Sequence, residues 1–243
     1  MRPAETERHL LVDLGNSSVK VGELPQSASS LSAPGEPATP GTELLARIAT
    51  TPPQWSGSPI DLLDLDWGSA SITWHLASVN PPAASQWIDR LRATRPDDRV
   101  RLLNRGDFSM TVEVTYPERL GLDRLAAAAA AVRLKRNDVG AVVVDAGTAT
   151  TVDAISAVGH FLGGAILASP QLMLRLLADH TRQLPRLSDT DSPEPPTSIG
   201  RDTTAALRSG AFWGQVGAVR MLIEKHRETL GADIDLFLSL IHI

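Results

Sequence analysis

Two segments of this chain carry an aspartate, a glycine and short polar side chains in the same order. The first covers residues 13–20 and begins Asp-Leu-Gly-Asn-Ser, and the second covers residues 145–153 and begins Asp-Ala-Gly-Thr-Ala. Each segment follows an apolar run. The run predicts a strand, the glycine a sharp turn, and the residues after it a second strand. The backbone N–H groups of such a turn can bind phosphate, and an aspartate at a strand end can bind a cation or its water. The repetition therefore predicts phosphate and cation chemistry.

Each of these aspartates also has an ordinary alternative, in which it accepts a hydrogen bond from the backbone of its own turn. The two copies, 145 − 13 = 132 residues apart, make this alternative less favoured. Lys20 is either a solvated strand lysine or a point charge for a transferred phosphoryl group. The phosphate-binding pattern G-x-x-x-x-G-K-[ST] does not occur in the sequence, so any phosphate site is of another kind.

A third group of residues, Gly-Leu-Asp-Arg at 121–124, begins an expected helix. Asp123 either favours the helix dipole or acts as a general base toward a substrate hydroxyl. Arg124 can hold an anion with its planar guanidinium. Tyr116, the only tyrosine in the chain, lies just upstream. The residues alone do not decide between the structural and the functional interpretation of this segment.

The elements that must position these residues alternate between strands and helices, which is typical of an α/β fold. Residues 25–59, rich in Pro, Ser, Gly and Ala, are expected to be a long surface insertion apart from a helix-like stretch at 43–49. Helices are expected at residues 83–92, 122–135, 170–179 and 205–227. Strands are expected at 10–14, 18–24, 72–79, 100–103, 110–114, 141–145, 150–155 and 160–167, and from 235 onward.

Composition excludes several classes of function. The 243 residues carry a net charge of −5, which argues against nucleic acid as the main partner. There is no cysteine, so disulfides, thiolate metal sites and thiol catalysis are excluded, and the chain suits a reducing cytoplasm. The charged N-terminus is not expected to be a secretory signal, and no apolar run approaches the roughly 20 residues of a membrane span. The six histidines show no metal-binding spacing.

In combination the motifs resemble those of type III pantothenate kinases, a family of the actin, sugar-kinase and heat-shock ATPase superfamily. The shared motifs are D-x-G-N-[ST]-x-x-K at 13–20, G-x-D-R at 121–124, D-x-G-T-A-x-T-x-D at 145–153, G-G-x-I at 163–166 and a glycine-rich helix over 200–217. The resemblance implies two ribonuclease H-like halves, at residues 9–115 and 116–243, with a nucleotide cleft between them. It also implies ATP-dependent phosphorylation of pantothenate to 4'-phosphopantothenate, the first step of coenzyme A biosynthesis.

Carried over to this sequence, the resemblance assigns Asp123 as the catalytic proton acceptor and Asp145 as the ligand of a monovalent cation, K⁺ or NH₄⁺. It implies Mg²⁺ bound with ATP, and a cytoplasmic homodimer in which Thr204 approaches the partner's pantothenate. The expected ATP-binding residues are Asp13, Leu14, Gly15, Asn16, Ser17, Ser18, Val19, Lys20 and Thr148. The expected substrate-binding residues are Tyr116, Gly121, Leu122, Asp123, Arg124 and Thr204.

The sequence departs from the family pattern at its C-terminus. Residues 235–238 begin the usual strand, but the chain ends at Ile243 before the family's glycine turn and last helix, so we expect a truncated or replaced tail. A non-enzymatic accessory protein on the same scaffold is the main alternative function. The intact set of Asp13, Asp123, Arg124 and Asp145 favours the kinase over it. A sugar or acetate kinase is a weaker alternative, which the G-x-D-R motif and the short length disfavour.

Overall fold

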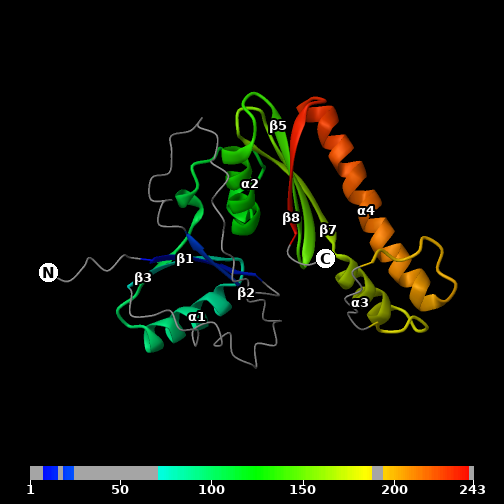
Figure 1. The fold of residues 1–243 in the computed structure, drawn as a ribbon, viewed down its shortest axis with the longest axis horizontal. Coiled ribbons are helices and arrows are strands. Elements are labelled where there is room, and N and C mark those ends of the chain that lie inside the picture. The colour runs from blue at the N-terminus through cyan, green and yellow to red at the C-terminus, as the bar shows by residue number, and fades with distance from the viewer. Residues whose placement is uncertain (1–7, 16–18, 25–70, 188–193, 241–243) are drawn as a thin grey trace. The chain divides into compact units, whose positions relative to one another are not determined.

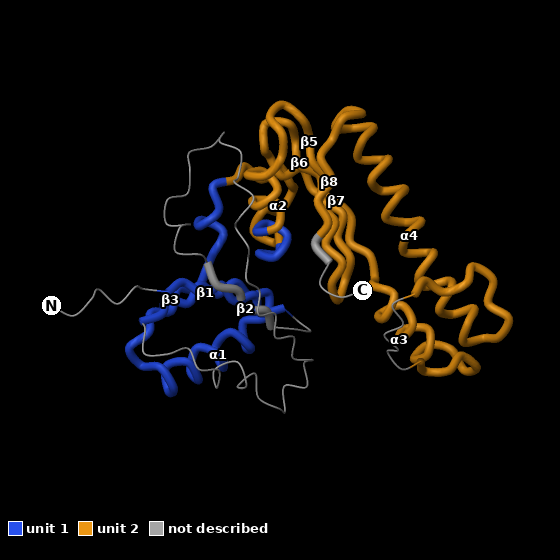
Figure 2. The backbone as a smooth tube through the Cα atoms, viewed as in Figure 1, with its two compact units in different colours: residues 1–109, 121–126 blue, residues 110–120, 127–243 orange. Residues whose placement is uncertain are grey.

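The computed structural model arranges the chain around two four-stranded sheets, each within its own compact unit (Figures 1 and 2). It describes residues 8–15, 19–24, 71–187 and 194–240. The first unit groups residues 1–109 with 121–126, and the second groups 110–120 with 127–243. The expected insertion at 25–59 lies outside the described residues, as do the turn residues 16–18.

The first sheet has the strand order β2-β1-β3-β4. Strand β1 (Arg8–Leu14) pairs antiparallel with β2 (Val19–Leu24) and parallel with β3 (Ile72–Ser78), which pairs parallel with β4 (Arg99–Leu102). Alternate residues of β1 are buried, as expected of a strand with one face on a core, whereas the first three residues of β3 are all buried.

Helix α1 (Pro81–Thr94) packs on one face of this sheet. Trp87 and Leu91 are buried against β1 and β3 with Ile88 beside them, as their spacing on the helix predicts. The Trp74 and Trp87 rings form a T-shaped contact, with centroids 5.4 Å apart. Asp98 fixes the start of β3 because its carboxylate accepts the indole N–H of Trp74 at 2.8 Å.

The second sheet has the order β7-β6-β5-β8. Strands β5 (Gly140–Ala146), β6 (Ala149–Ile155) and β7 (Phe161–Ala168) form an antiparallel meander. The last strand, β8 (Ile234–Leu240), pairs parallel with β5. The central part, an antiparallel hairpin whose first strand also pairs with a parallel strand, repeats the arrangement of β2, β1 and β3. The expected α/β class with two similarly built halves is confirmed.

Helix α4 (Thr203–Leu230) covers one face of the second sheet, beside α3 (Pro170–His180) (Figure 1). Its Ile223 joins a buried cluster with the β-strand residues Val142, Val144, Val152 and Ile234. The ring Nε2 of His226 lies 3.2 Å from the carbonyl oxygen of Val152. Apolar packing and this polar contact hold α4 against β5 and β6.

Helix α2 (Leu122–Leu134) is divided between the units, with residues 122–126 grouped in the first and the rest in the second (Figure 2). Two short 3₁₀ turns, η3 (Arg105–Asp107) and η4 (Pro117–Arg119), precede it. The strand expected at residues 110–114 is wrong. Val112 makes only an isolated bridge to Phe161, because β-forming residues without a continuous partner do not extend into a strand.

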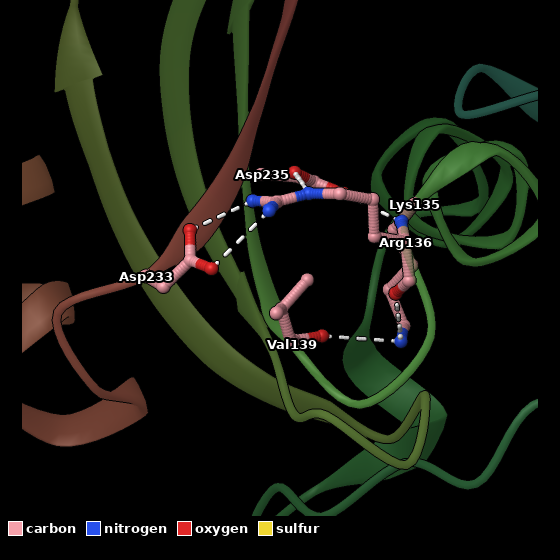
Figure 3. A network of polar contacts seen from close by, with 5 residues as sticks. All are labelled: Lys135, Arg136, Val139, Asp233 and Asp235. Carbon is pink, nitrogen blue, oxygen red and sulfur yellow. Dashed lines mark hydrogen bonds and ion pairs between the residues drawn. The ribbon is translucent and has the colours of Figure 1, made fainter.

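A polar network follows the end of α2 and ties it to the second sheet (Figure 3). The Lys135 ammonium donates to three backbone carbonyls, those of Arg136, Val139 and Ala157, at 3.3, 3.1 and 2.7 Å. The Arg136 guanidinium donates to Asp233 at 2.8 and 3.2 Å and to Asp235 at 2.7 Å. The loop before β5 and the start of β8 are thereby joined.

Among the described helices, none combines the length and the apolar character that crossing a lipid bilayer requires.

Candidate active site

The first aspartate of the paired motifs, Asp13, lies at the carboxyl end of β1 and opposite Lys20 of β2 in the antiparallel register. Its neighbour Leu14 is fully buried in the core with Val12, so the alternation of the strand places Asp13 on the opposite face, where it is half-buried. A carboxylate there, two residues before Gly15, suits a ligand held at the turn.

The start of α1 lies beside this strand end but cannot supply amides for a phosphate. Pro81 and Pro82, its first two residues, have no N–H to donate. The N–H of Ala83 donates to the Asn80 side chain at 3.2 Å, and that of Ala84 donates to the Asn80 carbonyl at 3.0 Å. The first turn of α1 therefore offers no unbonded backbone N–H to a phosphate at this end of the sheet.

The G-x-D-R segment forms the start of α2, as expected. Asp123 is exposed, and its Oδ1 accepts the backbone N–H of Arg124 at 2.8 Å. A Cβ on Gly121 would lie 2.3 Å from that same oxygen, so the carboxylate occupies space that only glycine leaves open. Arg124 is half-buried. The carboxylate is thus accessible yet held in one orientation by local contacts.

Tyr116 lies at the turn that precedes this segment and is 56% exposed. The guanidinium carbon of Arg119 lies 4.7 Å from the centre of its ring, a cation–π contact. The phenol is therefore an accessible polar group on a short, ordered 3₁₀ turn, η4.

The second aspartate, Asp145, lies near the end of β5 and is half-buried, with its Oδ1 shielded from solvent. In the register it stands between Thr151 of β6 and Ser239 of β8. Thr148 is exposed at the hairpin turn. Carboxylate, hydroxyl and carbonyl oxygens are the ligands of hard cations, so this strand end fits a monovalent cation chemically.

No group of three or more histidine, aspartate or glutamate side chains gathers as a metal site within the part of the chain that the structure describes. A single aspartate completed by substrate phosphates is a common way of holding Mg²⁺, and Asp13 fits that pattern.

Thr204 lies in the first turn of α4 and is half-buried. The start of this helix is well held, because Asp202 accepts the backbone N–H of Ala205 at 2.8 Å. A Cβ on Gly200 would lie 2.2 Å from the backbone nitrogen of Ala206, so the preceding loop packs directly on the helix. Thr204 therefore lies in a helix start that is capped by Asp202 and closely packed by the preceding loop.

The two units divide the expected site residues between them (Figure 2). The first unit holds Asp13, Leu14, Gly15, Val19, Lys20, Gly121, Leu122, Asp123 and Arg124, and the second holds Tyr116, Asp145, Thr148 and Thr204. Asn16, Ser17 and Ser18 lie outside the described residues.

Sequence reasoning missed one feature of the second hairpin. Asp153 is the last residue of the motif at 145–153, and the sequence predicted no role for it. Its side chain is nevertheless buried, with only 1% exposed. A Cβ on Gly164 would lie 2.4 Å from Asp153 Oδ1 and 2.2 Å from the Val152 carbonyl oxygen. The group that approaches Gly164 is therefore this buried aspartate and its strand.

The family model for type III pantothenate kinases matches residues 9–225. A Rhodopirellula baltica protein named type III pantothenate kinase is 35% identical over 226 residues, which cover 87% of this chain and 81% of that protein. A Thermomicrobium roseum protein of the same name is 32% identical, with coverage of 91% and 81%. A Thermus thermophilus protein of that name is 35% identical over 159 residues, and the match spans only 60% of its length.

Among solved structures, a Bacteroides thetaiotaomicron protein with an actin-like ATPase fold and unknown function aligns with 97% of this chain and 91% of its own. The identity is 7% and the TM-score is 0.32.

Proposed function

This chain belongs to the type III pantothenate kinase family, and we propose that it transfers the γ-phosphoryl group of ATP to the primary hydroxyl of pantothenate. The product is 4'-phosphopantothenate, and the reaction opens coenzyme A biosynthesis. The observation that carries the proposal is the family match over residues 9–225, which includes both Asp-x-Gly hairpins and the G-x-D-R segment.

In this reaction Asp123 accepts the proton of the pantothenate hydroxyl as its oxygen attacks the γ-phosphorus, and ADP leaves. The accessible carboxylate at the start of α2 suits this role. Arg124 and the Tyr116 phenol provide donors for the carboxylate and hydroxyl groups of pantothenate. Most of the rate enhancement comes from positioning and charge stabilisation, as in other phosphoryl transfers.

The β1–β2 hairpin binds the ATP phosphates, and Thr148 of the second hairpin contacts the nucleotide. Support comes from Asp13 at the strand end and from the start of α1, whose first amides are absent or already bonded. Mg²⁺, held by Asp13 and the phosphates, would neutralise charge on the β- and γ-phosphoryl oxygens.

Asp145 holds a monovalent cation, K⁺ or NH₄⁺, which would offset phosphate charge beside the second hairpin. The half-buried carboxylate, opposite Thr151 in the register of β5 and β6, supports this. Turnover should fall after dialysis into a Tris buffer free of both ions and return on addition of potassium chloride. The Asp145→Asn variant should lose this response. Full turnover without either ion would contradict the role.

The protein assembles as a homodimer through α4, with Thr204 near the partner's substrate, and works in the cytoplasm. Gly210, Gly214 and Gly217 are exposed along this helix, and a Cβ at any of them would meet nothing within 4 Å. Glycines at this spacing leave room for a second helix to approach closely, and a twofold dimer is the commonest arrangement.

A coupled assay of ADP release, with and without pantothenate, tests the proposed function. We expect ATP consumption that depends on pantothenate and that yields a phosphorylated product of matching mass. A folded protein that binds ATP but releases no ADP in the presence of pantothenate and potassium would favour the accessory-protein alternative.

A further inference from the structure

We propose that Gly121 is a positioning residue for Asp123. Because glycine has no side chain, the Oδ1 atom of Asp123 can occupy the space beside it, and Oδ2 is then the oxygen that accepts the proton. The inference rests on the proposed function of Asp123 as the base. It concerns the effect of Gly121 on the orientation of Asp123, which is separate from any contact between Gly121 and the substrate.

The contacts at the start of α2 carry the argument. Asp123 Oδ1 accepts the Arg124 backbone N–H at 2.8 Å. A Cβ on Gly121 would lie 2.3 Å from this oxygen but 3.9 Å from Oδ2. One carboxylate oxygen is therefore committed to the helix start, and the other is directed away from the crowded space. A residue with any side chain at 121 would displace the committed oxygen.

Displacing the Asp123 carboxylate should cost little stability but should lower the rate of phosphoryl transfer. The group that must move is the end of a flexible side chain, which can rotate about χ1 and χ2 into the solvent around this exposed residue. Gly121 does not have positive φ, so alanine fits its backbone. Misplacing a catalytic group by about 1 Å can cost roughly 10²-fold in rate.

The kinetic test is the Gly121→Ala variant. We expect kcat to fall about 10- to 100-fold, while KM for pantothenate and the melting temperature stay close to wild type. In an Asp123→Ala background the same change should cost nothing further, because no carboxylate remains to be displaced. A raised KM with unchanged kcat, or an equal loss in both backgrounds, would show direct substrate contact and overturn the proposal.

Gly106→Ala is the matched control. Its Cβ would also approach a side-chain oxygen, Asn104 Oδ1 at 3.1 Å, in the exposed turn η3 away from the candidate site. We expect its activity to equal that of wild type.

A structural readout separates this proposal from the proposed function. In wild type, the NMR shift of the Arg124 amide proton should follow the protonation of Asp123 as the pH is lowered, because Oδ1 accepts that proton. The response should vanish in Asp123→Ala and shrink in Gly121→Ala. An unchanged response in Gly121→Ala would overturn the proposal whether or not the protein phosphorylates pantothenate. An inactive wild type that keeps the expected responses would refute only the proposed function.

Discussion

At the scale of single residues, Asp123 is the side chain on which the proposed chemistry depends most. Its exposure and its bond to the Arg124 N–H make it a held but accessible carboxylate. Replacing it by asparagine preserves the size and the acceptor for that N–H but removes the proton acceptor. We expect Asp123→Asn to keep the fold and lower kcat by about 10²–10⁴-fold in the coupled assay. Near-normal turnover at saturating substrate would exclude Asp123 as the base.

At the scale of elements, the network after α2 secures the last strand of the second sheet (Figure 3). The backbone N–H of Arg136 donates to Asp235 at 2.6 Å. This bond, and then the Arg136 guanidinium, lowers the pKa of the Asp235 carboxyl below its usual range. The side-chain bonds to Asp233 and then to Asp235 raise the pKa of the Arg136 guanidinium further above its usual range.

Because the Asp235 pKa is lowered in the folded state, its contribution to stability is present above the unfolded-state pKa of about 4 and disappears as the pH falls through the folded-state pKa. We expect Asp235→Asn to lower the urea midpoint at neutral pH and to differ less from wild type near pH 3. Asp233→Asn is the control, because that side chain is more exposed and makes no bond to the Arg136 backbone. A deficit of Asp235→Asn that stayed constant with pH would contradict the assignment.

At the scale of the whole molecule, the open glycine face of α4 leads to a prediction about assembly. Gly214→Leu should fit within a single chain, since its Cβ meets nothing within 4 Å, and it raises helix propensity by roughly 0.8 kcal/mol. A leucine there would nevertheless obstruct a partner helix. We expect a monomer in light scattering, with a melting temperature that reflects the lost interface and reduced activity through Thr204.

As a control, a leucine introduced at an exposed position of α1, Gln86→Leu, should leave the dimer intact. A wild-type protein that is monomeric and fully active at nanomolar concentration would remove the dimer proposal and the shared role of Thr204 together.

The sequence by itself determined the α/β class, the two hairpins and the position of Asp123 at a helix start, because periodicity, turn residues and short motifs are local properties of the chain. Only the tertiary structure decided the rest. Residues 110–114 have strand-like composition but find a single bridge to Phe161. Arg136 and Asp235 are 99 residues apart in sequence, and no local pattern predicts their contact. The close approach of Asp123 to Gly121 and of Asp153 to Gly164 likewise depends on atomic positions that no sequence motif specifies.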